Sequence, residues 1–378
     1  MKILITGGSG FIGSNLALAL LQKKHDVVVL DNLSPQIHGD NAAETSPLYN
    51  SIKGKVTFIK GDVTSKDDWQ KALTGVDIIV HYAAETGTGQ SMYEINKYTN
   101  VNVGGTAIML DLLANNSSLN VKKVIVASSR SIYGEGKYFS EETGYVFPKH
   151  RDAADMSNGD FEVKYGDQKT PLQLVATDEE SKIHPSSVYG ITKQNQEQMV
   201  LCVCKAIGIK ALAFRYQNVY GPGQSLTNPY TGILSIFSSL ILNNKPINIF
   251  EDGKESRDFV FIDDVVEATI LGIENDTIDN DVFNVGSGVA TDVVTVAKTL
   301  LKKYGKDVPL TITGNYRLGD IRHNFADLTK IKKTLGFAPK VDFDNGISKF
   351  TSWVSGQSVK ESRFDESIQE MKAKGLFK

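Results

Sequence analysis

Residues 2–13 read KILITGGSGFIG, an apolar run that leads into a glycine-rich loop. Gly7, Gly10 and Gly13 have the spacing G-x-x-G-x-x-G and stand between an expected strand and an expected helix. Because glycine has no Cβ, such a loop turns tightly and lets a pyrophosphate reach the backbone N–H groups at the start of the helix. The stretch therefore predicts a strand–loop–helix unit that binds a dinucleotide.

The second apolar run, VVVLD, places Asp31 at the end of an expected strand, 18 residues after Gly13. A carboxylate there accepts hydrogen bonds from the adenosine ribose hydroxyls and repels a 2′-phosphate, so the sequence favours NAD over NADP. Asp62, after the third expected strand, is a candidate for contact with the adenine edge, and a plain turn residue is the alternative. Further cofactor contacts predicted at these strand ends are Phe11, Ile12, Asn32, Val63 and Ala83.

Outward from this unit, short apolar strands alternate with amphipathic helices through the first half of the chain. The expected strands cover residues 2–6, 26–30, 56–60, 77–83, 122–128 and 209–216, and the expected helices cover 10–23, 67–73, 93–114 and 189–207. Alternation with continuous apolar strands predicts a parallel sheet covered on both faces. The predicted fold class is α/β, a Rossmann-type doubly wound parallel sheet with a smaller C-terminal α/β substrate lobe.

The second half of the chain is less regular, with expected helices at 233–242, 264–274 and 291–304 and a charged terminal helix from Val359. We expect an NAD-binding domain over 1–217 and a substrate-binding lobe over 218–378, with residues 259–285 returning to the first domain. The polar insertion 136–182 has poor helix signals. A stretch of that length inside a compact domain is usually a functional cover or a mobile loop.

The composition restricts the possible partners. Of 378 residues, 41% are hydrophobic and 22% charged, and the net charge of −3 does not suggest nucleic acid or an anionic membrane as a partner. The apolar runs are too short to span a bilayer and the N-terminus lacks a signal-peptide layout, which favours the cytoplasm. Cys202 and Cys204 lie in an apolar run and are expected to be buried thiols. The six histidines show no metal-ligand spacing, so no metal is predicted.

The sequence SSVYGITK, residues 186–193, holds Tyr189 and Lys193 four residues apart, on one face of an expected helix. A lysine ammonium beside a tyrosine lowers the pKa of the phenol and lets it act as a base near neutral pH. An exposed helix pair is the alternative for this common spacing. The dinucleotide loop and the serines of ASSRSIYGEG, residues 127–136, favour a catalytic pair.

Together these motifs resemble the extended short-chain dehydrogenases that modify nucleotide sugars, and the resemblance runs from TGGSGFIG at the N-terminus to LGF near Phe337. It implies a catalytic triad of Ser129, Tyr189 and Lys193. In that family the tyrosinate removes a sugar hydroxyl proton, the serine holds the hydroxyl, and the lysine also grips the nicotinamide ribose.

The resemblance also implies contacts outside the triad. Those near the cofactor or the sugar nucleotide are Asn102, Glu85, Thr86 and Asn218. Arg257 in ESRDFVF and Arg317 in RLGDIRH match the family's phosphate-binding positions. Arginine suits this task because its planar fork bonds phosphate oxygens in pairs. Ordinary surface salt bridges are the alternative for these two arginines.

The residues after the triad serine bear on the reaction. The family shares oxidation at C4 of the sugar by bound NAD, and its 4,6-dehydratases carry Asp-Glu directly after the triad's serine or threonine. Here those positions hold Arg130 and Ser131. Arginine is not a proton donor at neutral pH and serine is a poor base. The resemblance therefore implies a 4-epimerase, with Arg130 and Ser131 beside the substrate.

Three stretches, AAETGTGQSMY, SSRSIYGEG and RYQNVYGPGQSLTNPYTGIL, are similar to 4-epimerases that interconvert dTDP-L-rhamnose and dTDP-6-deoxy-L-talose. Those enzymes often carry a C-P-x-C-G element where this chain has YGDQ, residues 165–168. The alternatives are a UDP-hexose 4-epimerase, a 4,6-dehydratase, a reductase that releases NADH, and a binding module without catalysis.

The expected helices that begin near Tyr93 and Tyr189 carry apolar faces, AIMLDLLA and MVLCVCKAIGI. In the family the matching helices form a four-helix dimer interface. An isologous pairing would bury both faces at once, so we expect a homodimer.

Overall fold

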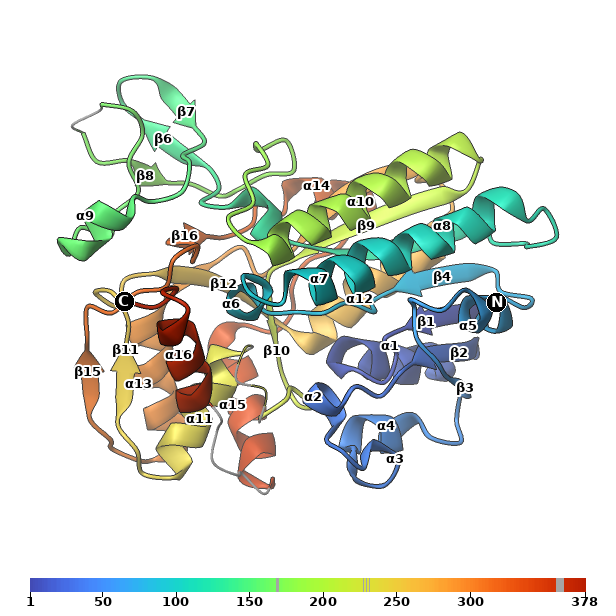
Figure 1. The fold of residues 1–378 in the computed structure, drawn as a ribbon, viewed down its shortest axis with the longest axis horizontal. Helices are drawn as coiled ribbons and strands as arrows, with labels where there is room; N and C mark the ends of the chain where they lie inside the picture. Colours follow the sequence, from blue (N-terminus) through green and yellow to red (C-terminus); the bar gives the residue numbers. More distant parts are fainter. Residues whose placement is uncertain (168–169, 227, 229, 231, 358–363) are drawn as a thin grey trace.

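The structure is a computed structural model that describes residues 1–167, 170–226, 228, 230, 232–357 and 364–378 (Figure 1). At its centre lies a sheet of seven parallel strands in the order β13-β9-β5-β4-β1-β2-β3. The strands are β1 (Lys2–Thr6), β2 (Asp26–Asp31), β3 (Thr57–Lys60), β4 (Ile78–His81), β5 (Lys123–Ser129), β9 (Lys210–Tyr216) and β13 (Asn280–Val285). The predicted Rossmann-type α/β fold is confirmed.

Helices cover both faces of this sheet, as its apolar strands require. On one face α1 (Phe11–Gln22) and α12 (Ile262–Glu274) pack against Ile3 and Ile5. On the other face α5 (Lys66–Ala72), α8 (Gly105–Asn115) and α10 (Val188–Ala206) pack against Leu4 and Val28. The strand order reverses between β1 and β4, and ligands of such sheets bind at the carboxyl ends of the strands beside that point.

One predicted helix differs from the expectation. The span 93–114 is divided into α7 (Ile95–Tyr98), the π-helical turn η1 (Thr99–Gly104) and α8. A π-turn widens a helix by one residue and commonly occurs at functional sites. This one contains Asn102, which is fully buried.

The described part of the C-terminal lobe is built from short strands and helices. Its strands are β10 (Asn218–Tyr220), β11 (Ile247–Ile249), β12 (Ser256–Phe261), β14 (Ala290–Asp292), β15 (Leu310–Ile312) and β16 (His323–Asn324). Its helices are α11 (Ile233–Leu242), α13 (Val293–Tyr304), α15 (Phe343–Ser355) and α16 (Phe364–Ala373). The helix α14 (Thr329–Leu335) lies beside β13. Val359, where a terminal helix was predicted to start, lies outside the described residues. The described residues that follow it form α16.

The polar insertion 136–182 has more regular structure than its sequence predicts. It forms a small antiparallel sheet of β6 (Tyr138–Ser140), β7 (Gly144–Val146) and β8 (Gln173–Leu174), together with α9 (Ala153–Ser157). These elements project beyond the central sheet (Figure 1). Gln168 of the YGDQ stretch lies outside the described residues.

Short helices follow the strand ends that face the central crevice. They are α2 (Pro35–His38), α3 (Ala42–Thr45), α4 (Pro47–Ile52), α6 (Thr88–Ser91) and the 3-10 turn η2 (Arg130–Tyr133). Among the described residues no helix has the length and apolar character needed to cross a membrane.

Candidate active site

A cavity of about 490 Å³ runs along the carboxyl ends of the strands. The loops after β1, β2, β3, β4, β5 and β9 contribute to its wall, as does α10. Most of the predicted site residues line it together: Gly7, Gly10, Phe11, Ile12, Gly13, Asp31, Asn32, Asp62, Val63, Ala83, Glu85, Thr86, Ser129, Arg130, Ser131, Tyr189, Lys193 and Asn218. The local motifs of the sequence therefore converge on one site.

The glycine loop is packed too closely for side chains. Gly7 has a φ of +65°, and a Cβ there would lie 2.8 Å from the backbone nitrogen of Ala83. A Cβ on Gly13 would lie 2.5 Å from the carbonyl oxygen of Gly7. No side chain caps α1 at Gly10 within the described part of the chain, which leaves the N–H groups of the first turn for an anion. This cradle fits a pyrophosphate.

Asp31 lies buried at the end of β2. Its carboxylate accepts hydrogen bonds from the backbone N–H groups of Ser9 (2.9 Å) and Leu33 (2.8 Å). Burial raises the pKa of Asp31, and these two hydrogen bonds oppose the rise. Asn32 donates to Asp62 at 2.9 Å, so the two predicted adenosine-side loops are tied to each other. Asp31 is placed where a ribose-binding carboxylate is expected in this fold.

Ser129, at the end of β5, and Tyr189, in the first turn of α10, meet in the cavity. Burial raises the pKa of Tyr189, while a hydrogen bond with Ser129 and the positive charge of Arg130 lower it. Nζ of Lys193 donates to Oε1 of Gln196 at 2.8 Å, and burial lowers the pKa of Lys193 to about 7. The effect of Lys193 on the phenol stays a prediction, and Arg130 is a second cation that lowers the Tyr189 pKa.

Arg130 has an unusual environment. Burial lowers the pKa of its guanidinium to about 9, and the nearby charge of Arg257 adds to that effect. Its Nη1 atom is enclosed, and no residue in the described ranges forms a hydrogen bond with it. An enclosed, unpaired guanidinium nitrogen is costly unless a ligand completes its hydrogen bonds.

Asn102 is brought near the site but does not line the cavity. Its carboxamide accepts the N–H of Glu85 (2.8 Å) and donates to the carbonyl oxygen of Glu85 (3.1 Å) and to Thr192 (2.9 Å). It therefore fastens the loop after β4 to α10. Glu85 in turn pairs with Lys97 at 3.1 Å.

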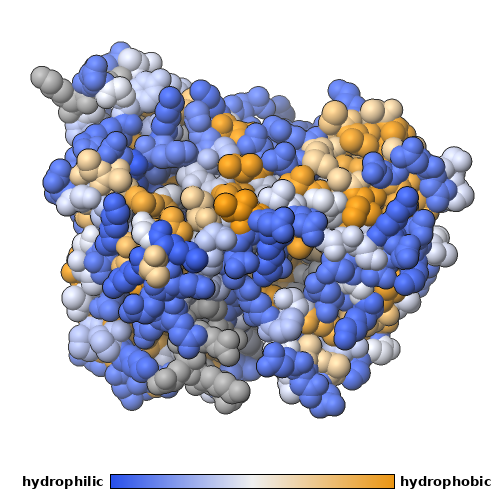
Figure 2. Space-filling model, in the orientation of Figure 1, coloured by the Kyte–Doolittle hydropathy of each residue, from blue (hydrophilic) through white to orange (hydrophobic). Residues whose placement is uncertain are grey.

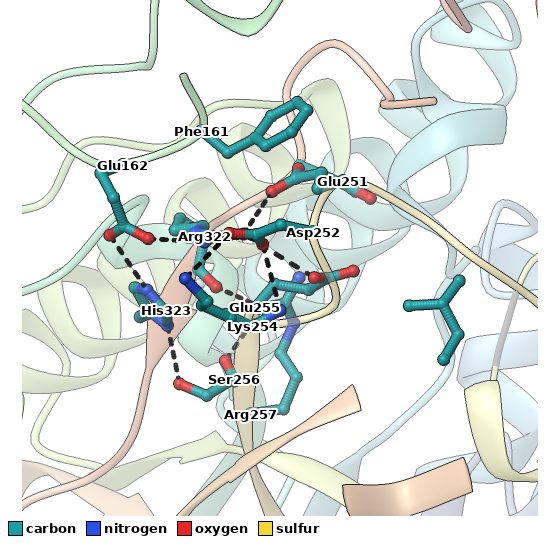
Figure 3. A network of polar contacts seen from close by, with 12 residues as sticks. Phe161, Glu162, Glu251, Asp252, Lys254, Glu255, Ser256, Arg257, Arg322 and His323 are labelled. Carbon is teal, nitrogen blue, oxygen red and sulfur yellow. Dashed lines mark hydrogen bonds and ion pairs between the residues drawn. The ribbon is translucent and has the colours of Figure 1, made fainter. Parts of the chain in front are cut away.

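Arg257 and Arg317 do not line the cavity. Arg257 donates to the carbonyl oxygens of Ser256 and Arg322, both at 2.9 Å, beside a network of charged residues (Figure 3). The guanidinium of Arg317 lies over the rings of Phe250 (5.0 Å) and Phe364 (5.9 Å). Arg257 nevertheless lies near enough to Arg130 for its charge to lower the pKa of that residue.

The charged network of Figure 3 joins the insertion to the C-terminal lobe. Arg322 is fully buried and donates to Glu251 (2.9 Å), Asp252 (2.7 Å) and Glu162 of the insertion (2.5 Å). Arg151, also from the insertion, forms a two-pronged pair with Glu251 at 2.8 Å for each bond. The insertion is therefore anchored by the buried Arg151–Glu251 pair and by Glu162, a partly exposed partner of the buried Arg322.

Several cavity residues were not singled out from the sequence. They include Gln36, Ile37, His38, Gln217, Gln224 and Tyr230. A signal was available for Gln217, because it follows β9 directly and adjoins Asn218 in the quoted stretch RYQNVYGPG. The residues after β2 carry no comparable motif. Among the described residues no group of three or more histidine, cysteine or acidic side chains could hold a metal ion.

Fold and site together define an enzyme that uses a dinucleotide in a Rossmann-type crevice. The chain belongs to the NAD dependent epimerase/dehydratase family, whose model matches residues 3–152 and 163–286, and NAD is its cofactor. It is 37% identical over 356 residues to a dTDP-L-rhamnose 4-epimerase of Burkholderia thailandensis, covering 94% of this chain and 95% of the relative.

Solved structures of nucleotide-sugar 4-epimerases are also similar to this chain. A UDP-glucuronic acid 4-epimerase from Bacillus cereus, in complex with UDP-glucuronic acid and NAD, superposes with a TM-score of 0.76 at 26% identity, over 94% of this chain and 99% of that one. A UDP-glucose 4-epimerase from Thermotoga maritima with UDP-glucose gives a TM-score of 0.74 at 28% identity, with the same coverage.

Proposed function

We propose that this chain is a nucleotide-sugar 4-epimerase that interconverts dTDP-L-rhamnose and dTDP-6-deoxy-L-talose through a transient 4-keto sugar. The observation that carries the proposal is the convergence of Ser129 and Tyr189 on the cavity that also holds the glycine loop and Asp31. The choice of sugar rests on similarity to the dTDP-L-rhamnose 4-epimerase over nearly the whole chain.

The cofactor end of the cavity fits NAD. The glycine loop would hold the pyrophosphate, Asp31 the adenosine ribose, and Lys193 the nicotinamide ribose. When bound, NAD supplies a reversible acceptor for the hydride from C4 of the sugar. The protein's own part is to fix the sugar, move the proton of its 4-hydroxyl and exclude water.

Tyr189 is the proposed base. It removes the proton of the 4-hydroxyl as its phenolate, while Ser129 holds that hydroxyl in place. Burial opposes formation of the phenolate, and the charge of Arg130 favours it. After the keto sugar has turned over, Tyr189 would return the proton to O4 as the hydride returns to the opposite face of C4, so the enzyme would end in its starting state.

The two positions that resemble the acid and base positions of the 4,6-dehydratases hold neither an acid nor a base here. Loss of the C6 hydroxyl needs an acid and a base beside C5 and C6, and the two positions after Ser129 hold Arg130 and Ser131. Both line the cavity. Neither provides that acid and base at neutral pH, so we infer that dTDP-glucose is not dehydrated.

For the diphosphate we propose Asn218 and Arg257. Asn218 lines the cavity, and the NH₂ group of its amide can donate to a phosphate oxygen. The charge of Arg257 reaches Arg130, a cavity residue. Arg317 is less well placed, since aromatic rings cover its guanidinium.

The test is incubation of the purified protein with dTDP-L-rhamnose and, separately, with dTDP-glucose, with the H4 coupling of the sugar followed by proton NMR. We expect a talo-configured product from the first and no 4-keto-6-deoxy product from the second. A dehydrated product from dTDP-glucose would refute the role given to Arg130 and Ser131.

A UDP-hexose 4-epimerase is the second candidate, because solved structures of UDP-glucose and UDP-glucuronic acid 4-epimerases superpose on this chain. Turnover of a UDP-hexose without turnover of dTDP-L-rhamnose would favour it. The chemistry proposed for Tyr189 and Ser129 is the same in both cases.

We also propose that the chain pairs with a second copy through α8 and α10. Apolar residues gather over these two helices (Figure 2), and Ile191 on α10 is 47% exposed. Partly buried Ile108, Met199 and Val203 adjoin the core below them. Sedimentation velocity at micromolar concentration should show a dimer that Ile191→Asp weakens, and a monomer alone would contradict the pairing.

A further inference from the structure

Gln196 is a buried polar residue that the proposed chemistry does not use. It lies on α10, three residues after Lys193, and is 0% exposed. Its Oε1 accepts from Nζ of Lys193 at 2.8 Å. Its Nε2 donates to Oγ1 of Thr106 at 2.9 Å and lies 3.3 Å from Nε2 of His81. Burying a carboxamide destabilises the folded protein unless both its oxygen and its NH₂ group form hydrogen bonds.

The orientation of this carboxamide is fixed by the lysine. An ammonium only donates hydrogen bonds, so the oxygen of Gln196 must face Lys193 and its NH₂ group must face Thr106 and His81. Burial lowers the pKa of His81 to about 3, which makes the ring neutral. Thr106 gives its own proton to Asn102, so the 3.0 Å contact between Nε2 of His81 and Oγ1 of Thr106 needs the ring proton on Nε2, and Nδ1 accepts from Oγ1 of Thr6 at 2.8 Å.

Both branches of this hydrogen-bond chain end at loops of the cofactor site. Oγ1 of Thr6 accepts the N–H of Ala83, a cavity residue, at 3.1 Å. On the other branch Thr106 donates to the carbonyl oxygen of Asn102 at 2.6 Å. The side chain of Asn102 grips Glu85. Gln196 thus joins Lys193 to both sides of the loop after β4.

The hydrogen-bond partner of Lys193 is the neutral amide of Gln196, because the nearby acidic residue is paired with another cation. Glu197, the acidic group whose charge acts on Lys193, is held by Arg215 through bonds of 3.0 and 2.6 Å. His81 on β4 is neutral. In the part of the chain that the structure describes, Gln196 is the only hydrogen-bond acceptor of Nζ of Lys193.

We propose that Gln196 is a positioning residue for Lys193: it keeps the ammonium in place and connects it to both sides of the loop after β4. This inference rests on the proposed role of Lys193 in holding the cofactor ribose. It concerns any substrate of the family's C4 oxidation, and not dTDP-L-rhamnose alone.

The test compares Gln196→Met, which removes the acceptor at similar length, with Gln196→Glu, which restores one. Gln70→Leu, on the exposed side of α5, is the control. Without the acceptor the lysine loses its proton at lower pH, so the alkaline limb of the kcat–pH profile of Gln196→Met should move down by about 1 to 2 units. Its NAD should dissociate at least about tenfold faster, and Gln196→Glu should recover both properties.

NAD dissociation is followed in the absence of any sugar, so a wrong choice of substrate leaves this part of the test intact. A Gln196→Met variant that matches Gln70→Leu in pH profile and NAD release would overturn the proposal. Equal impairment of the Met and Glu variants would assign Gln196 a packing role and overturn it as well. If Gln196→Met does not fold, Gln196→Glu decides: loss of NAD there contradicts the proposal.

Discussion

Replacing Asn102 by alanine should loosen the loop after β4. The fully buried carboxamide forms three hydrogen bonds, of 2.8, 3.1 and 2.9 Å, to Glu85 and Thr192. At about 1 kcal/mol of net stabilisation for each bond, Asn102→Ala should reduce the free energy of unfolding by about 3 kcal/mol. Because the loop that carries Glu85 also lines the cavity, affinity for NAD should fall as well.

The assay is urea unfolding followed by fluorescence, together with NAD titration by calorimetry. Asn115→Ala is the matched control: it removes one exposed hydrogen bond at the end of α8 and should change stability by about 0.5 kcal/mol or less. Asn102→Ala stability equal to that of the control would refute the reasoning. A large loss of stability with unchanged NAD affinity would show that the loop does not depend on Asn102.

Three other predictions concern the chemistry. Tyr189→Phe should lower kcat by about 10²–10⁴-fold and keep its NAD, since the phenol is the proposed base; steady-state rates within a few-fold of wild type would mean that another group takes the proton. Arg130→Met should move the acid limb of the kcat–pH profile to higher pH, because the charge of Arg130 lowers the Tyr189 pKa, and Arg130→Lys should move it less. The protein as purified should release NAD on denaturation, detected by chromatography, and epimerise without added NAD; finding only NADP would contradict the role of Asp31.

Local patterns were sufficient for the sheet and for the glycine loop. The run KILIT and the loop after it form β1 and a cradle without room for a Cβ, because apolar strands and glycine spacing depend on neighbouring residues only. The α/β fold, the family and the NAD cofactor were predicted correctly. Ser129 and Tyr189 were also predicted to meet, since both follow from motifs at strand and helix ends.

Features that depend on distant partners were not predictable in the same way. The π-turn at Asn102 was expected to be plain helix, and its side chain is committed to Glu85 and Thr192, 17 and 90 residues away. Arg317 was grouped with phosphate contacts, but Phe364 of the C-terminal helix lies against it. The domain boundary at residue 217 and the roles of the individual site residues stay predictions.

The buried ion pairs beneath the insertion set a limit on how the gene could be shortened. Cutting out 136–182 would remove Arg151 and leave the carboxylate of Glu251, whose side chain is 5% exposed, with one cation fewer. Arg322 would lose Glu162 in the same step. Removing one partner of a buried pair typically costs about 3–5 kcal/mol, because a charge is left in a dry environment. A shortened chain would therefore need compensating neutral residues in the C-terminal lobe.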